Sequence, residues 1–184
     1  MSQLKGIELF IDVFMLLDKA NPEGVNKQEL IKECQARKLT TDQLDEWLKP
    51  FPTDTIDMAT FCRHLGFDLN SMRLEETERA KSREESDQTV ANDIEVISTT
   101  MSVAKQIDIT EKFKDLVKKI GTDASKLNTI PEQLKAYMDE KYLPGWQVIM
   151  LEGSYWMQFS HEPLTSLQFR YDSLICLVWR TPMN

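Results

Sequence analysis

The stretch SLQFRYDSLICLVWR, residues 166–180, decides the fold of the C-terminal half of this 184-residue chain. From Leu167 to Tyr171 apolar and polar side chains alternate, as they do in a strand with one buried face. Asp172-Ser173 is a candidate tight turn, and the LICLVW run that follows is apolar on both faces. We therefore expect two strands here, with the second in the centre of a sheet.

The residues upstream of this stretch extend the sheet and predict two helices. Residues 146–153 and 155–161 have the texture of strands, and residues 94–98, IEVIS, are a short strand candidate. Between them, apolar residues recur at helical spacing in two groups. These are Phe113, Leu116, Val117 and Ile120, and then Ile130, Leu134, Tyr137 and Met138. The order strand, helix, helix, four strands predicts an α/β unit over residues 92–184, with two helices against an antiparallel sheet.

The N-terminal third is predicted to be all-helical. Apolar residues recur at helical spacing in residues 4–17, and the segment NPEGVN then breaks the pattern, since Pro and Gly end helices. The same sequence of helix, break and helix follows again, with the second break at PFPTDT. Residues 1–68 therefore read as two similar helix–loop–helix units.

Residues 69–91 differ from both halves in composition. After Leu74 almost nothing apolar occurs before Val90, and Glu75 stands four residues before Arg79. This pattern predicts a solvated helical linker with weak internal ion pairs, or a partly disordered tether. The predicted fold class is thus α+β with two domains, an all-α pair and an α/β unit, joined by a charged helical linker.

Composition limits the class of partner. The net charge is −8 and the pI about 4.9, which argues against nucleic acid and against electrostatic docking on anionic membranes. No run approaches the length of a membrane span, and the N-terminus lacks a signal-peptide layout. Cys34, Cys62 and Cys176 each lie in an apolar stretch, which indicates reduced, buried thiols and a cytoplasmic location.

The first interhelical loop has part of the pattern of a calcium-binding EF-hand. In DKANPEGVNKQE, Asp18, Asn26 and Glu29 occupy positions 1, 9 and 12 of such a loop. Positions 3, 5 and 6 lack the required residues, and the second loop is several residues too short. Val25 and Ile56 stand where paired loops contact each other. We expect no metal and no cofactor, with weak calcium binding at the first loop as the alternative.

No combination of residues predicts an enzyme. Ser160, His161 and Glu162 are consecutive, and adjacent residues of a strand point to opposite faces, so they cannot form a triad. Cys176 is embedded in an apolar run, as expected of an inert thiol. His64 is predicted to lie on a helix, and no nucleophile elbow, P-loop, HExxH or CxxC motif occurs. A hydrolase that uses His161 is the remaining enzymatic alternative.

Binding is the more promising class, and residues 155–161, YWMQFSH, are its main candidate. An exposed strand edge can accept the strand of a partner peptide. The alternative is that Trp156 and Phe159 pack inside the sheet.

Three motifs carry a family resemblance: DEKYLPGWQVIML, the run ending FSHE, and SLQFRYDSLICLVWR. With them, residues 94–180 resemble the dynein light chain (LC8-type) domain. Together with the degenerate EF-hand pair in front, nearly the whole chain resembles the tegumental allergen-like proteins of parasitic flatworms. These proteins join an EF-hand domain to a dynein light chain domain.

The resemblance implies a homodimer in which one strand crosses to the partner subunit. Peptides of motor (dynein) or cytoskeletal partners would then add along that strand, beside a helix at residues 133–141. The implied strand comprises Tyr155, Trp156, Met157, Gln158, Phe159, Ser160 and His161. Gly153-Ser154 would form the preceding turn. The implied function is a non-enzymatic adaptor of the tegument, associated with dynein or the cytoskeleton; the alternative is a weak calcium sensor.

One position departs from the resembled family. The histidine that follows the family's tryptophan, and that is linked to pH-dependent dimerisation, is Gln147 here. We therefore expect that a dimer of this chain does not dissociate on mild acidification.

Overall fold

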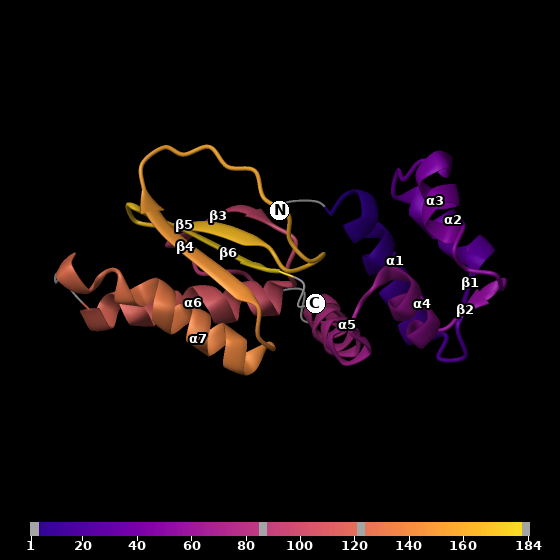
Figure 1. Ribbon diagram of the computed structural model, residues 1–184, viewed down its shortest axis with the longest axis horizontal. Coiled ribbons are helices and arrows are strands. Elements are labelled where there is room, and N and C mark those ends of the chain that lie inside the picture. Colours follow the sequence, from indigo (N-terminus) through magenta and orange to yellow (C-terminus); the bar gives the residue numbers. More distant parts are fainter. Residues whose placement is uncertain (1–3, 85–87, 121–123, 182–184) are drawn as a thin grey trace. The chain divides into compact units, whose positions relative to one another are not determined.

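A computed structural model describes residues 4–84, 88–120 and 124–181 of the chain. They form two compact units, and the first ends at Glu84. The N-terminal unit is helical, whereas the C-terminal unit combines helices with an antiparallel sheet (Figure 1). This confirms the predicted α+β class with two domains.

The N-terminal unit contains two helix–loop–helix pairs, as predicted. The helices are α1 (Gly6–Ala20), α2 (Lys27–Ala36), α3 (Thr41–Leu48) and α4 (Met58–Leu65). Each interhelical loop carries a two-residue strand, β1 (Val25–Asn26) or β2 (Thr55–Ile56), and the two strands pair antiparallel. Val25 lies opposite Ile56 and both are fully buried, which confirms the predicted contact between the loops.

Local capping fixes where these helices begin. The side chain of Asn26 accepts hydrogen bonds from the first turn of α2, and Asp57 does so for α4. Both satisfy amide groups that have no partner within the helix. Phe14 of α1 and Phe61 of α4 stack in the core between them, with ring centroids 3.7 Å apart.

Helix α5 (Leu69–Glu84) departs from the prediction of a solvated linker. It is helical as predicted, but it packs against α1 and belongs to the N-terminal unit. Arg79 is buried and bridges Glu75, at 2.7 Å, and Asp12 of α1, at 3.1 Å. Charged side chains, rather than an apolar stripe, hold this helix, so hydrophobic periodicity does not reveal its position.

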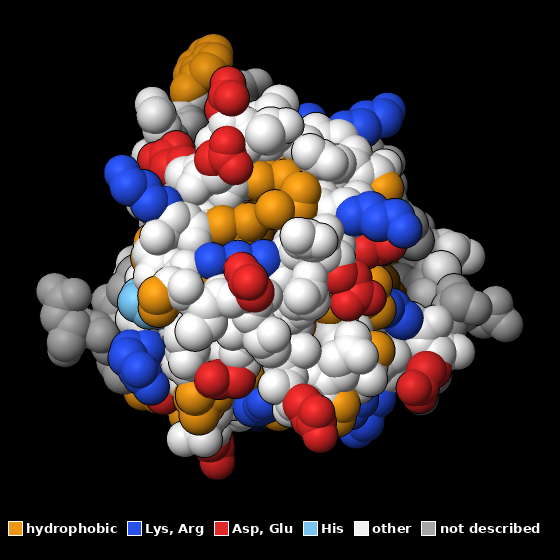
Figure 2. Space-filling view, turned by 90° about the vertical axis from the view of Figure 1, so that its right-hand side faces the viewer, with side chains coloured by type: hydrophobic (Ala, Val, Ile, Leu, Met, Phe, Trp, Pro, Cys, Tyr) orange, Lys and Arg blue, Asp and Glu red, His pale blue; other side chains and the backbone are white. Residues whose placement is uncertain are grey.

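Figure 2 is a space-filling view of one face. Acidic and basic side chains are interspersed over this face, with apolar side chains between them. The view offers no continuous basic surface of the kind that phosphate groups require.

The C-terminal unit packs two long helices on one face of a four-stranded sheet (Figure 1). The helices are α6 (Val103–Ile120) and α7 (Thr129–Lys141), with a 3-10 turn, Ala124–Lys126, before α7. The strands are β3 (Ile94–Thr99), β4 (Trp146–Glu152), β5 (Leu167–Tyr171) and β6 (Leu174–Arg180), in the order β3-β5-β6-β4. Strand β6 pairs on both sides, which confirms its predicted central place.

The two edge strands differ in regularity. Strand β3 has a register irregularity between Val96 and Ser98, whereas β4 pairs with β6 without interruption. The β5–β6 turn contains Asp172 with φ of 56°, a left-handed conformation that Asp adopts more readily than most residues. The predicted turn at this position is confirmed.

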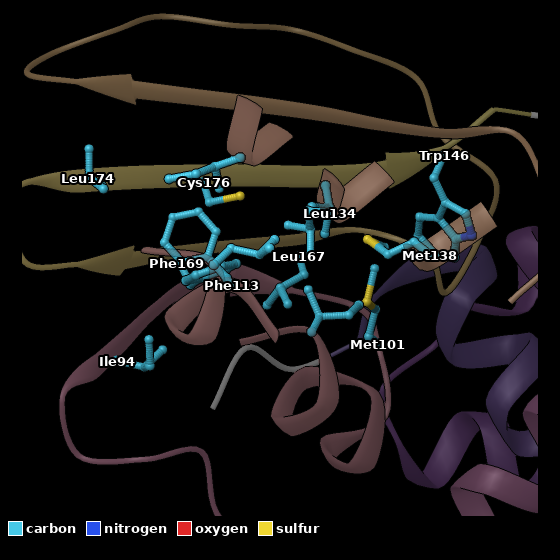
Figure 3. Packing of buried hydrophobic residues seen from close by; sticks show 14 of the residues in the cluster. Ile94, Met101, Phe113, Leu134, Met138, Trp146, Leu167, Phe169, Leu174 and Cys176 are labelled. Atoms are coloured by element: carbon cyan, nitrogen blue, oxygen red, sulfur yellow. The ribbon is translucent and has the colours of Figure 1, made fainter. Parts of the chain in front are cut away.

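The core of this unit lies between the sheet and the two helices (Figure 3). Phe113 of α6 meets Phe169 of β5 edge-to-face, with centroids 5.1 Å apart. Met138 of α7 and Trp146 of β4 lie at one end of the cluster, and Cys176 lies above Phe169. Among the residues that the structure describes, no helix is both long and apolar enough to cross a bilayer.

Residues 155–161, predicted to form a strand, have no regular secondary structure in the single chain. Only three strands therefore follow the helices, where four were expected. A strand needs a neighbour for its backbone hydrogen bonds, and the described residues provide none for this segment. Figure 1 shows it as an arch that leaves β4 and returns to β5.

Candidate partner-binding edge

Strand β4 is an accessible edge of the sheet. It pairs with β6 along its whole length, from Trp146 opposite Arg180 to Glu152 opposite Leu174. On its other side, no strand from the described part of the chain pairs with it. The amide of Trp146 donates to Asp139 of α7 at 3.0 Å, so the start of the strand is tied to the helix beside it.

The side chains of β4 alternate between the two faces. Val148 and Met150 pack against the core with Trp146, whereas Ile149 points to the opposite face and is 44% exposed. We call this opposite face the outer face of the sheet; on β6 it carries Leu177. An edge strand with an exposed apolar residue is a surface that favours partner binding.

The segment that follows β4 is unusually apolar for its exposure. Gly153 bends the chain with φ of 86° and so separates the segment from the strand. Trp156 is 94% exposed, and Met157 and Phe159 are also among the exposed large hydrophobic residues. The alternative that Trp156 packs inside the sheet is therefore wrong for the single chain.

The downstream end of the segment is held on the sheet. The ring of Phe159 lies 5.0 Å from that of Trp179 and 5.5 Å from the His161 ring. The amide of Glu162 donates to the Arg180 carbonyl oxygen at 2.9 Å, and the two side chains form an ion pair at 3.3 Å. Residues 159–162 are thus anchored to β6.

A small cavity of about 220 Å³ lies beside this anchor on the outer face. Phe159 and His161 line it from the segment, Gln168 from β5 and Leu177 from β6. The cavity thus lies between the segment and the outer face of β5 and β6.

The structure separates the residues that could have supplied nucleophilic chemistry. Cys176 lies in the core on the helical side, whereas His161 lies beside the cavity on the outer face. Burial raises the pKa of the Cys176 thiol, which keeps it protonated and unreactive. Ser160 is exposed, and the ring nitrogen Nδ1 of His161 is 2.8 Å from the Glu162 carbonyl oxygen.

Asp108 of α6 organises the helical side of this unit, and sequence reasoning missed it. It accepts hydrogen bonds from Tyr137 at 2.8 Å, Tyr142 at 2.6 Å and Lys141 at 2.5 Å. Burial opposes its ionisation, but these bonds outweigh that effect, and the pKa of Asp108 lies below its ordinary value. A single Asp on an amphipathic helix gives no signal before the facing helix is placed.

Two of the three EF-hand remnants have other partners within the protein. Asp18 is buried and bound by Arg73 of α5, whereas Asn26 is exposed and uses its side chain to cap α2. Glu29 is exposed on the first turn of α2. Among the described residues, no group of three or more His, Cys, Asp or Glu is arranged as a metal site.

The chain is similar to known proteins over nearly its whole length. The family described as "Dynein light chain type 1" matches residues 93–181, which include the sheet and both long helices. The "Tegument antigen" of Schistosoma mansoni is 38% identical over 184 residues, covering 98% of this chain and 97% of the relative. The chain belongs to the tegument antigen family.

A second relative supports membership of the tegument antigen family. "Antigen Sm21.7" of Schistosoma mansoni is 34% identical and is aligned over 97% of this chain and 98% of its own. Among solved structures, the dynein light chain-like domain of the Fasciola hepatica calcium binding protein FhCaBP2 is 53% identical. It covers 52% of this chain and 98% of its own, with a TM-score of 0.49.

Proposed function

We propose that this tegument antigen is a non-enzymatic adaptor that dimerises and binds peptides through residues 155–161. One observation carries the proposal: a regular edge strand, β4, is followed directly by an apolar segment that pairs with no described strand. The segment has the same length as β4, seven residues. In the proposed dimer it leaves its own subunit and pairs with β4 of the second copy.

Strand exchange would leave the outer edge of the exchanged segment open. A partner peptide in extended conformation adds there, beside α7, with backbone hydrogen bonds supplying affinity and side-chain pockets specificity. The dimer presents two such edges, so bivalent partners bind with increased avidity. Peptides of dynein or cytoskeletal complexes in the cytoplasm of the tegument are the proposed partners.

The N-terminal unit serves as a calcium-insensitive scaffold in this proposal. Two of the three remnant ligands of its first loop are already bound within the protein, Asp18 by Arg73 and Asn26 by the amides of α2. The alternative of a weak calcium sensor requires both to be released.

Proline substitution tests the dimer. Neighbouring residues of a strand direct their backbone groups to opposite sides, so Met157→Pro with Gln158→Pro removes donors from both edges. We expect the wild-type chain to sediment as a dimer and the double proline variant as a monomer. The matched variant, Met157→Ala with Gln158→Ala, keeps the amides and remains dimeric. A monomeric wild-type chain, or a dimeric proline variant, would overturn the proposal.

Peptide display tests the adaptor function separately. We expect the full-length wild-type chain to select a set of extended peptides from a random library. Selection should fail with the double proline variant and persist with the double alanine variant. Equal selection by all three would place the peptide site elsewhere.

A further inference from the structure

The buried carboxylate of Asp18 is bound by a cation that belongs to the protein. Asp18 lies in the last turn of α1 and is 2% exposed, and Arg73 of α5 donates to its Oδ2. The same guanidinium nitrogen lies 2.9 Å from Oε2 of Glu76, which is 6% exposed. Two nearly buried carboxylates thus share one arginine, whose own side chain is about half-exposed.

Asp18, which Arg73 holds, stands at position 1 of the EF-hand loop. The other positions cannot complete a calcium shell, because Ala20 and Pro22 have no side-chain oxygen at positions 3 and 5. Asn26 at position 9 accepts from the amides of Gln28, at 2.9 Å, and Glu29, at 3.3 Å. The residues present do not fit a calcium ion.

The position of Arg73 is set by a second contact between the same two helices. Arg79 of α5 is paired with Asp12 of α1. On α1, Asp12 comes six residues before Asp18, and on α5, Arg79 comes six residues after Arg73. Equal spacing in opposite directions is expected of two antiparallel helices, because six residues of either helix rise by about 9 Å. The packing of α5 therefore places a guanidinium at Asp18.

Charge compensation explains why Arg73 is needed. A buried carboxylate without a partner is strongly destabilising, and removal of one member of a buried pair leaves that charge uncompensated. In an EF-hand loop with all its ligands, the ion supplies this positive charge. Here Arg73 supplies it from a neighbouring helix.

We infer that Arg73 takes the place of the divalent cation of the first loop: it supplies the positive charge that the buried Asp18 carboxylate requires, and the loop does not take up calcium even when that charge is removed. The inference rests on the calcium insensitivity proposed above and explains it. It concerns the N-terminal unit and is independent of the peptide edge.

The test compares the full-length variant Arg73→Gln with Arg83→Gln. Arg83 also pairs with α1, at 2.7 Å from Asp12, but does not contact Asp18. We expect Arg73→Gln to melt at a lower temperature than both wild type and Arg83→Gln, and calcium not to raise its Tm, because the loop lacks the ligands of a calcium shell. Wild type and Arg83→Gln should show neither calorimetric heat nor a Tm shift with calcium.

A double-mutant cycle supports the test without calcium. We expect Asp18→Asn and Arg73→Gln to be non-additive. The folding equilibrium constant of the double variant should be about tenfold larger than the two single effects together imply. Arg73→Lys, which keeps the charge, serves where Arg73→Gln does not fold: it should retain most of the wild-type stability, and its combination with Asp18→Asn should again be non-additive.

The outcomes separate the two proposals. Additive effects at positions 18 and 73, or a Tm of Arg73→Gln that calcium restores, would overturn the inference and leave the calcium insensitivity of the wild-type chain standing. Calcium binding by the wild-type chain that Asp18→Asn abolishes would overturn both.

Discussion

The ring of Phe159 packs on the ring of Trp179 at a centroid distance of 5.0 Å, on the outer face of the sheet. This contact holds the segment 155–161 back on the subunit to which it belongs. The proposed exchange with a second copy must break it, so the contact favours the monomer.

Phe159→Ala should therefore loosen the segment in the monomer. In the monomeric double proline background, we expect faster exchange of the Glu162 amide, which donates to the Arg180 carbonyl oxygen, and a loss of stability of about 1 kcal/mol, the scale of an aromatic pair. Hydrogen exchange and urea unfolding measure the two effects. Trp156→Ala is the control, since Trp156 is 94% exposed and its loss should change neither. Unaltered exchange in Phe159→Ala would show that the ring does not hold the segment.

Asp108→Asn should destabilise the C-terminal unit by about 1–3 kcal/mol near neutral pH, because it weakens charge-assisted hydrogen bonds from α7 and Tyr142. The folded pKa of Asp108 lies below the ordinary 3.8, so its stabilising contribution is present above that value. It disappears as the pH falls through the folded pKa.

Urea unfolding between about pH 6 and pH 2 checks this dependence. The difference in stability between wild type and Asp108→Asn should shrink across the acid range. A difference that stays constant with pH would show that the loss is one of packing rather than of charge.

The three cysteines should not react with thiol reagents in the folded chain. All three are buried, and burial raises the pKa of Cys34 to about 12 and that of Cys62 to about 11. At mildly alkaline pH they are therefore protonated and shielded. Labelling with an aromatic disulfide reagent should yield no modified thiol before denaturation and three after it. Rapid labelling of the native chain would contradict the burial.

Gly24→Ala should destabilise the N-terminal unit more than Gly66→Ala. Gly24 has φ of 124°, and a Cβ there would lie 2.7 Å from Cγ2 of Thr55 and 3.3 Å from the Ile56 carbonyl oxygen. Gly66 also has a positive φ, 75°, but nothing lies within 4 Å of a Cβ there. We expect about 1 kcal/mol for Gly66→Ala and roughly 2–3 kcal/mol for Gly24→Ala, measured by thermal unfolding. Equal losses would mean that the loop can move to admit the methyl group.

The proposed dimer should keep its mass between about pH 7 and about pH 5.5, because Gln147 cannot take up a proton there. Sedimentation at both pH values measures this. Dissociation that His161→Gln prevents would assign a pH switch to His161 and contradict the expectation.

Sequence patterns predicted those parts of the fold that depend on burying apolar side chains. Alternation in residues 166–180 predicted β5 and the central β6, and helical spacing predicted α6 and α7. Helix α5 was predicted as a helix, but its packing against α1 was not predicted, because the arginines that hold it have partners far away in the sequence. Hydrophobic spacing carries no information on such pairs.

The candidate site could be predicted only in part. The apolar composition of residues 155–161 identified the segment, and its exposure fits a role in binding. Its conformation could not be derived, since a strand is defined by its neighbour and a single sequence does not say which chain supplies it. The contacts of Asp108 and of Asp18 were missed for a related reason: each becomes visible only when two helices are brought together.

The irregularity in β3 limits how far assemblies of this protein can grow. Bulged, charged strand edges resist pairing, and β3 carries both a break in register and Glu95, whereas β4 is regular. The sheet can therefore be extended on one side only. In the proposed dimer the exchanged segment covers each β4 edge, and the β3 edge at the other end of each sheet does not template a third copy. Reciprocal exchange would therefore close the assembly as a pair, and the edge that stays open for an extended peptide is that of the exchanged segment.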